Sequence, residues 1–274
     1  MPNLLQILFP AKVDYKTEFD FTQFPMTEIV KQNREGLQEV PDWFDRKAME
    51  ESCFQYGVPD FIRDKINKPL NDDFTYTDLM VALSRKHFPN KLHYLEIGVS
   101  VGKNFYQMLK AVSNGEFTGF DIEEINPVLE TKLSFQSKES WSSPRSSIKK
   151  TDSSVKTYSF DGNPVRYISG DVWDENSWKK LHGKKFNLIF SDALHSSDAI
   201  LFEFEMIVKY DLLDEKFLIF WDDLHGKMRK AFLNIVRKYN EKFMIKDVYL
   251  IQINGWIGQH ENQHPVGIIS NIPL

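Results

Sequence analysis

The stretch from position 93 to position 112 has the pattern of a strand, a glycine turn and a helix in direct succession. An apolar run at 94–97 predicts a short buried strand that ends at Gly98, and a second glycine follows at Gly102. Apolar residues then recur at helical spacing, at Phe105, Met108, Leu109 and Val112. Glycines let the backbone pass close to a ligand, and the first turn of the helix points N–H groups at it. This unit therefore predicts an α/β fold with a ligand site at the end of its first strand.

A second predicted strand, at 117–120, ends in Asp121. An acid in this position can accept hydrogen bonds from ribose hydroxyls, as it does in nucleotide-binding folds. The spacing Gly98-x-Ser100-x-Gly102 alone fits three interpretations. It can be a nucleotide or S-adenosylmethionine loop, the nucleophile elbow of an α/β hydrolase with Ser100 as nucleophile, or an ordinary turn between a strand and a helix.

Strands and helices continue to alternate along the rest of the chain. Further strands are predicted at 165–168, 186–190 and 217–221, and the second of them is apolar throughout, which favours a central place in the sheet. Helices are predicted at 196–213 and 227–243, and the segments 247–253 and 265–270 predict a closing antiparallel pair. The alternation indicates a mostly parallel sheet with helices on both faces.

Two regions depart from this alternation. Residues 1–74 are divided by prolines, and we interpret them as an N-terminal cap or oligomerisation segment without catalytic residues, with a helix at 43–56 that has Asp42 as its N-cap. The main domain spans residues 75–274. Within it, residues 130–160 are rich in Ser and Lys, and we interpret them as an insertion that is either a lid or, as the composition favours, a flexible surface loop.

The bulk properties exclude several classes of protein. A net charge of −5 argues against nucleic-acid binding, and no apolar run approaches the length needed to span a membrane. The apolar start of the chain has no basic residue ahead of it and no small-residue cleavage site, so no signal peptide is predicted. A single cysteine, Cys53, excludes an internal disulfide and a cysteine-rich zinc site. The default location is therefore the cytoplasm.

Acidic residues follow four successive predicted strands: Asp121, Asp171 in the pair Gly170-Asp171, Asp192, and the pair Asp222-Asp223. One acid at a strand end usually caps a helix, but several share the edge where ligands of open α/β sheets bind. If the strands before Asp192 and Asp222 are neighbours, about 5 Å apart, these carboxylates can converge on one Mg²⁺, Mn²⁺ or Ca²⁺ ion. His195 would then lie beside the ion as a base, or it packs at the start of the next helix.

Together, the segment LEIGVSVGKNF, Asp121, Gly170-Asp171, DALHS at 192–196 and WDD at 221–223 resemble class I S-adenosylmethionine-dependent methyltransferases. More narrowly, they are similar to the metal-dependent sugar O-methyltransferases of the macrocin and mycinamicin type, and to the cephalosporin-hydroxylase-like group. The resemblance covers about residues 75 to 270. It implies a Rossmann-like methyltransferase sheet, mostly parallel with an antiparallel closing strand. One departure is Ser100, which replaces the middle glycine of the commoner G-x-G-x-G loop.

The resemblance also implies a role for each matched position. The cofactor would be S-adenosyl-L-methionine with Mg²⁺ or Mn²⁺, the acceptor would be a hydroxyl of a small molecule such as a sugar or glycosylated metabolite, and the family suggests a homo-oligomer. The implied cofactor contacts are Glu96, Gly98, Ser100 and Gly102 at the amino-acid part, Asp121 at the ribose, and Asp171 with Val172 and Trp173 at the adenine. The implied metal ligands are Asp192, Asp222 and Asp223, with His195 as the general base.

Two other classes of function stay open at this point. A hydrolase would need Ser100, then Asp192 or Asp222, and a late histidine among His225, His260 and His264. That interpretation does not explain the acidic pair, and no HGGG-like oxyanion segment precedes the loop. A non-catalytic cofactor-binding protein is the other alternative, against which the complete set of acids argues. A dehydrogenase is disfavoured because the loop lacks G-x-G-x-x-G spacing.

Overall fold

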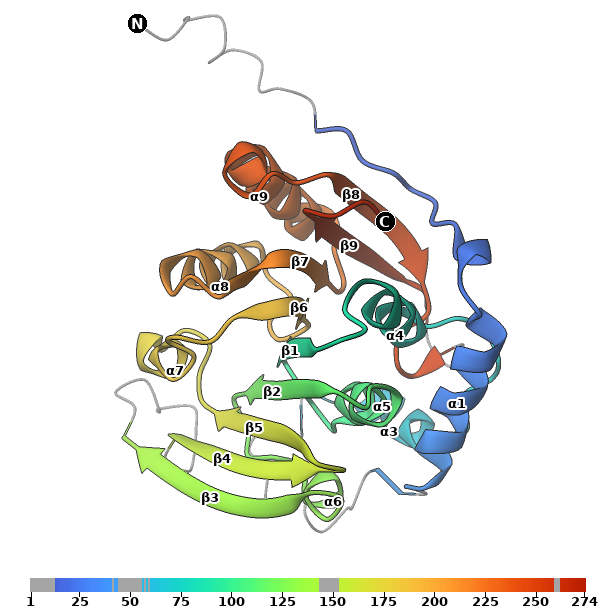
Figure 1. Cartoon of the computed structure of the whole chain (residues 1–274), viewed down its shortest axis with the longest axis vertical. Helices are drawn as coiled ribbons and strands as arrows, with labels where there is room; N and C mark the ends of the chain where they lie inside the picture. The colour runs from blue at the N-terminus through green and yellow to red at the C-terminus, as the bar shows by residue number, and fades with distance from the viewer. Residues whose placement is uncertain are drawn as a thin grey trace, which may run out of the picture.

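The computed structural model describes residues 13–40, 42–43, 56, 58, 60–142, 153–258 and 262–274. The described strands form one nine-stranded sheet in the order β3-β4-β5-β2-β1-β6-β7-β9-β8 (Figure 1). The strands are β1 (Leu92–Ile97), β2 (Gly115–Asp121), β3 (Ser134–Trp141), β4 (Ser153–Phe160), β5 (Asn163–Ser169), β6 (Phe186–Ser191), β7 (Leu213–Trp221), β8 (Asp247–Ile253) and β9 (His264–Ser270). The five central strands, β5 to β7 in that order, are parallel, whereas β9 is antiparallel to both β7 and β8.

Helices cover both faces of this sheet (Figure 1). One face carries α1 (Met26–Gln38), α4 (Tyr76–His87) and α5 (Lys103–Ala111), and the other carries α7 (Glu175–Lys179), α8 (Ser197–Lys209) and α9 (Gly226–Phe243). Strand β6 is buried along its whole length, as its apolar sequence predicts for a strand covered on both sides. The predicted fold class, a mostly parallel Rossmann-like methyltransferase sheet with an antiparallel closing strand, is confirmed. No helix in the described part of the chain has the length and apolar character required to cross a bilayer.

Residues 130–160 are not a flexible loop where the structure describes them, so that prediction is wrong for β3 and β4. These strands pair with each other and extend the sheet outward from β5. Strand β4 alternates in its burial, with Val155 in the core on one face and Tyr158 and Phe160 in the core on the other. These three apolar side chains, among many Ser and Lys residues, pack the hairpin against the core at the edge of the sheet. The segment lies along the edge of the sheet (Figure 1), and its residues 143–152 fall outside the described chain.

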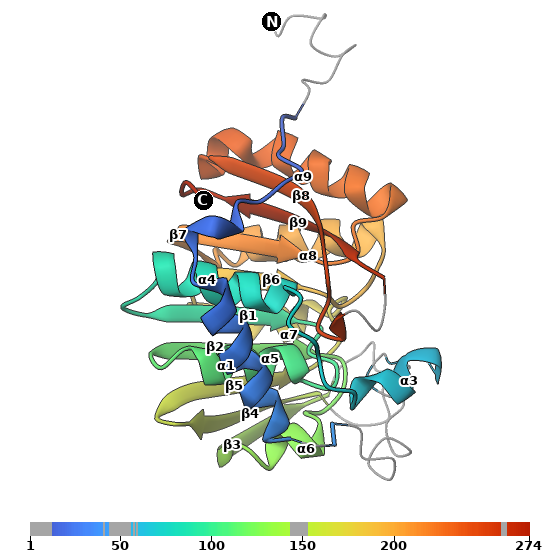
Figure 2. The same ribbon diagram turned by 90° about the vertical axis from the view of Figure 1, so that its right-hand side faces the viewer.

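The N-terminal region packs on the main domain instead of forming a core of its own. Helix α1 lies across α4 and α5 (Figure 2) and buries Ile29, Val30 and Leu37. Before it, Lys16 exchanges backbone hydrogen bonds with Val248 and Leu250 along β8. The short helices α3 (Asp60–Ile66) and α6 (Pro127–Glu130) complete this part of the fold. The helix predicted at 43–56, with Asp42 as its cap, falls largely outside the described residues.

A buried carboxylate joins α1 to the start of α4. Asp78, whose side chain is fully buried, accepts hydrogen bonds from the Thr75 backbone and hydroxyl, both at 2.9 Å, in a capping box. The same carboxylate accepts from Asn33 of α1 at 2.6 Å and from two guanidinium nitrogens of Arg34 at 2.8 and 3.1 Å. One side chain therefore satisfies a helix end and neutralises a buried cation.

We expect Asp78→Ala to lower the free energy of unfolding by about 3–5 kcal/mol, because it leaves the Arg34 charge buried without its counter-ion. Urea denaturation followed by circular dichroism measures this. Glu35→Ala is the control, since its pair with Lys31 spans 3.9 Å between exposed side chains and should contribute less than about 0.5 kcal/mol. An Asp78→Ala protein as stable as the Glu35→Ala protein would show that the pair does not hold α1 in place.

Candidate active site

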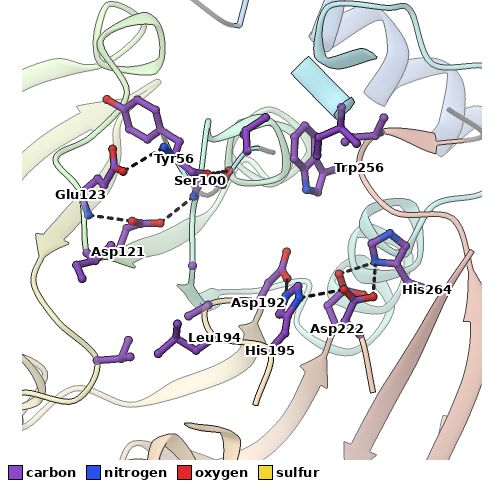
Figure 3. Close-up of a pocket in the computed structure, with 18 of the residues that line it drawn as sticks. Tyr56, Ser100, Asp121, Glu123, Asp192, Leu194, His195, Asp222, Trp256 and His264 are labelled. Carbon is purple, nitrogen blue, oxygen red and sulfur yellow. Dashed lines mark hydrogen bonds and ion pairs between the residues drawn. The ribbon is translucent and has the colours of Figure 1, made fainter. Parts of the chain in front are cut away.

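A cavity of about 440 Å³ opens at the carboxyl ends of the central strands. Its first part is formed by the loop after β1, by the end of β2 and by residues after β5, among them Gly98, Asp121 and Asp171. Its second part is formed by the carboxylate–histidine cluster, which we define as Asp192, His195, Asp222, Asp223 and His264 (Figure 3). The sequence predicts most of these residues at one edge of the sheet, and the structure brings them into one cavity.

Gly98 lets the loop after β1 pass close to the end of β6. Its φ of +86° lies in the left-handed region, and a Cβ atom there would stand 2.3 Å from the carbonyl oxygen of Asp192. Any side chain would push the two strand ends apart. The glycine therefore sets the distance between the loop and the first acid of the cluster.

Asp121 holds the loop in shape. Its Oδ2 accepts hydrogen bonds from the backbone N–H groups of Val99 and Ser100 at 2.8 and 2.9 Å, and its Oδ1 accepts from Glu123 N–H at 2.9 Å (Figure 3). Asp121 thus organises the loop and lines the cavity at the same time.

Ser100 is committed to the N-terminal region. Its φ of +54° is left-handed, and its hydroxyl donates a hydrogen bond of 2.5 Å to the Tyr56 carbonyl oxygen (Figure 3). The nucleophile of a hydrolase would instead donate to a catalytic base. This contact disfavours the hydrolase interpretation. Ser100 also lines the cavity, as predicted for a loop residue.

Glu96 and Gly102 do not line the cavity, so the geometry does not support their predicted cofactor contacts. Glu96 is buried between β1 and α5, where its Oε2 accepts from Tyr94 at 2.6 Å and Asn104 at 2.8 Å, and burial raises its pKa well above the usual value. Gly102 caps α5 at a φ of +89°, and a Cβ atom there would meet the Leu129 side chain at 2.6 Å. Both residues support the loop from behind.

Asp171 and Val172 line the cavity after β5, where the resemblance places the adenine contacts. The Asp171 Oδ1 accepts a hydrogen bond of 2.9 Å from the Trp173 backbone N–H. Val172 is almost fully buried and offers an apolar surface.

The sequence indicates a cap at residues 1–74 but assigns no site residues to it, whereas the structure places Tyr56, Val58, Ile62, Trp256 and Ile257 in the wall of the cavity. The first three belong to the N-terminal region, which therefore contributes to the site. Tyr56 is held there because its backbone N–H donates to Glu123 at 3.1 Å, in addition to the Ser100 contact. Apolar residues in a proline-rich segment carry no signal for such a placement.

His264 is the member of the cluster that the methyltransferase resemblance did not include. It is the first residue of β9, which runs antiparallel to β7 with Trp221 opposite Gly267. Because β9 is antiparallel to β7, it begins at the edge of the sheet where β7 ends. His264 therefore lies beside Asp222 and Asp223. The antiparallel closing strand predicted at 265–270 was a signal that could have found it, although its pairing with β7 was not predicted.

Two histidines bridge the three carboxylates of the cluster (Figure 3). His195 Nε2 lies 3.0 Å from Asp192 Oδ1, and His195 Nδ1 lies 3.0 Å from Asp223 Oδ2. His264 Nδ1 lies 2.7 Å from Asp222 Oδ2 and 3.3 Å from Asp223 Oδ1. Each imidazole thus lies between two carboxylates that would otherwise repel one another.

These contacts shift the protonation of the cluster. Hydrogen bonds to Asp192 and Asp223 raise the pKa of His195 to about 10, so its imidazole is cationic at neutral pH. Burial, together with the Asp222 charge, raises the pKa of Asp192 to about 7. The hydrogen bond from His195 lowers the pKa of Asp223. The cluster is therefore arranged around positive charge.

The cluster fits a divalent cation. Asp222 is buried, and its Oδ1 has no hydrogen-bond partner in the structure, although an unsatisfied buried carboxylate oxygen is costly. Asp222, Asp223 and His264 offer ligand atoms that all lie within 4.8 Å of one another. Asp192 does not belong to this group, since His195 stands between it and Asp223. Two of the three predicted metal ligands are therefore together, with a histidine in place of the third.

Comparison with known proteins gives similarity only among solved structures. No protein-family model matches the chain, and no curated protein does. An O-methyltransferase from Bacillus cereus in complex with SAH aligns over 89% of this chain and 99% of its own, with 12% identity and a TM-score of 0.47. TomG, an O-methyltransferase from Streptomyces achromogenes involved in tomaymycin synthesis, aligns over 90% and 97%, with 14% identity and a TM-score of 0.44. MycE, a methyltransferase from the mycinamycin biosynthetic pathway in complex with Mg, SAH and mycinamycin VI, aligns with 14% identity and a TM-score of 0.40. The match covers 69% of this chain and 49% of MycE, so this chain spans about half the length of MycE.

Proposed function

We propose that this protein is an S-adenosylmethionine-dependent O-methyltransferase that modifies a hydroxyl of a small molecule with the help of a divalent cation. The observation that carries the proposal is the single cavity into which both the glycine loop and the carboxylate–histidine cluster open. A volume of about 440 Å³ suits a small ligand, not a macromolecular surface. The loop supplies a place for a cofactor, and the cluster supplies a place for a reacting hydroxyl.

The loop part of the cavity suits S-adenosylmethionine. When bound, this cofactor supplies an electrophilic methyl group on a positively charged sulfonium. The backbone at Gly98 and Ser100 would hold its amino-acid part, Asp121 its ribose hydroxyls, and Asp171 with Val172 its adenine. Methyl transfer is an in-line displacement, so a rigid loop that positions the methyl group supplies much of the rate.

The cluster suits activation of the acceptor. A divalent cation held by Asp222 and Asp223 would supply positive charge that lowers the pKa of a hydroxyl beside it. His195 would take the proton of that hydroxyl on a ring nitrogen. Its pKa of about 10 results from Asp192 and Asp223, which face it, and a cation held in part by Asp223 would offset the charge of that carboxylate and favour loss of the imidazole proton.

The acceptor class follows from the same chemistry. A vicinal diol can bind a cation through both oxygens, which favours a sugar or a catechol-like ring. The apolar wall of the cavity, to which Trp256 and Ile257 contribute, suits the carbon face of such a ring.

Transfer of a labelled methyl group from S-adenosylmethionine tests the proposal. The purified protein is incubated with Mg²⁺ or Mn²⁺ and a panel of sugars, glycosides and catechols, and calorimetry measures binding of S-adenosylhomocysteine. Binding with transfer supports an enzyme, whereas binding without transfer to any hydroxyl in the panel favours the non-catalytic alternative. Absence of binding would refute both.

We expect Asp121→Ala to weaken S-adenosylhomocysteine binding by about 1–3 kcal/mol, because hydrogen bonds to a charged acceptor are lost and the loop amides lose their partner. Calorimetry measures the change. Glu116→Ala is the control, since Glu116 pairs with Lys91 at the other end of β2, and its affinity should equal that of the wild type. Equal affinity in the Asp121→Ala protein would remove Asp121 from the cofactor site.

A further inference from the structure

We propose that His264 is a ligand in a mixed nitrogen–oxygen cation site with Asp222 and Asp223, and that this site prefers a first-row transition ion such as Mn²⁺ or Co²⁺ over Mg²⁺. The inference rests on the proposed function for the identity of the cavity, but it concerns the cation alone. It replaces the all-oxygen triad expected from the sequence with a triad that contains an imidazole.

The first support is the convergence of the three side chains. Asp222 and Asp223 follow β7, His264 begins the neighbouring β9, and their ligand atoms lie within 4.8 Å of one another. The His264 Nδ1 atom faces both carboxylates, at 2.7 and 3.3 Å. An ion at the centre of this group would replace the direct contacts between His264 Nδ1 and the two carboxylates.

The second support is the unsatisfied oxygen of Asp222. This side chain is only 2% exposed, and one of its oxygens, Oδ1, has no hydrogen-bond partner. The other oxygen, Oδ2, is the one that faces His264. Burying a carboxylate oxygen without a partner costs free energy, so its presence beside two other ligand groups indicates a missing ligand and not a structural salt bridge.

The identity of the ion follows from the donor set. Mg²⁺ prefers oxygen ligands, whereas imidazole nitrogen suits Fe²⁺, Ni²⁺ and Zn²⁺, and Mn²⁺ begins the series of first-row ions whose affinity for nitrogen–oxygen sites rises toward Cu²⁺. Affinity at such a site should rise from Mn²⁺ to Co²⁺. Three protein ligands also leave coordination positions open for a substrate.

Asp192 has a different partner in this arrangement. Its Oδ1 is bound to His195, which also contacts Asp223. Asp192 therefore positions His195 and lies outside the group of converging ligand atoms. The two possible sites share Asp222 and Asp223 and differ in the third ligand. A site completed by Asp192 would bind the ion through oxygen only, whereas a site completed by His264 would bind it through one nitrogen as well.

The test measures the ion directly in the full-length protein stripped of metal. Calorimetry gives the affinities of Mn²⁺, Co²⁺ and Mg²⁺, and electron spin echo spectroscopy of bound Mn²⁺ detects a nitrogen ligand. We expect tighter binding of Mn²⁺ than of Mg²⁺, with ¹⁴N modulation of the echo. His264→Ala should weaken Mn²⁺ binding by roughly 10- to 100-fold or more and abolish the modulation.

Two further variants make the result specific. His225→Ala is the matched control, since His225 is exposed and its Nε2 lies 3.8 Å from Asp223; this variant should keep both the affinity and the modulation. His264→Asp restores an all-oxygen site, so it should bind Mg²⁺ more tightly than the wild type does and show no nitrogen signal. This second substitution keeps the test valid if His264→Ala fails to fold.

Three outcomes would overturn the inference: no cation binding, Mn²⁺ bound without ¹⁴N modulation, or modulation that survives in both His264 variants. Calorimetry with S-adenosylhomocysteine on the same samples keeps the proposed function separate. Retained cofactor binding with any of these outcomes refutes the role of His264 alone, whereas loss of cofactor binding in the wild type refutes the methyltransferase.

Discussion

Removing divalent cations with EDTA should abolish methyl transfer, and adding Mn²⁺ or Mg²⁺ should restore it. Without a cation, the acceptor hydroxyl has to ionise beside Asp192, Asp222 and Asp223, whose negative charge opposes that ionisation. A cation supplies several kcal/mol to such a step, so the rate should fall by at least about 10²-fold. Initial rates with labelled S-adenosylmethionine, before and after adding metal back, measure the effect.

The Asp222→Asn variant separates this role of the cation from a role in folding. The amide keeps the size of the buried side chain but removes its charge, so metal affinity and turnover should both fall. S-adenosylhomocysteine affinity should stay within about twofold of the wild type, because the substitution does not change the loop after β1 or its hydrogen bonds to Asp121. Asp214→Asn is the control, since Asp214 does not belong to the carboxylate–histidine cluster. It lies near the start of β7, whereas Asp222 follows the end of that strand. Undiminished turnover of the wild type in EDTA would contradict metal dependence.

The parallel core was predictable because its strands are apolar on both faces and are separated by helical periods. β6 illustrates this: every one of its residues is buried. The β3–β4 hairpin was not predictable in this way, since an edge strand is largely solvated and β3 buries none of its residues. Its Ser- and Lys-rich composition is shared by edge strands and loops, so only the pairing with β5 distinguishes the two.

The site shows the same division. Acids at the end of a strand or directly after it, such as Asp121 and Asp192, could be placed from the sequence because strand ends share one edge. The place of Glu96 could not be predicted in the same way, because it lies within β1, where the side chain faces one side of the sheet and not the strand end. It shares a face of β1 with Tyr94 and therefore points under α5 toward Asn104. His264 and Tyr56 enter the cavity through tertiary contacts between segments distant in the sequence.

His195→Ala should lower turnover by about 10²–10⁴-fold, the usual contribution of a positioned base. The reason is geometric. His195 stands between Asp192 and Asp223, 3.0 Å from each, and lines the cavity beside the proposed cation. The comparison uses kcat at saturating cofactor, acceptor and Mn²⁺. His182→Ala is the control, because His182 packs against Tyr210 and precedes β6, at the end of that strand opposite to the cluster, and should leave kcat unchanged.

The pH profile then distinguishes a base from a residue that only packs. If His195 removes the proton, the rate of the His195→Ala enzyme should rise with pH as hydroxide replaces the missing imidazole, and the gap to the wild type should narrow. Mn²⁺ affinity should persist, since His195 is not among the converging ligand atoms. If His195 only packs between its two carboxylates, the variant would melt at a lower temperature but keep the wild-type kcat and pH profile. That result would move the base to another group, and His225, whose Nε2 lies 3.8 Å from Asp223, would be the next histidine to replace.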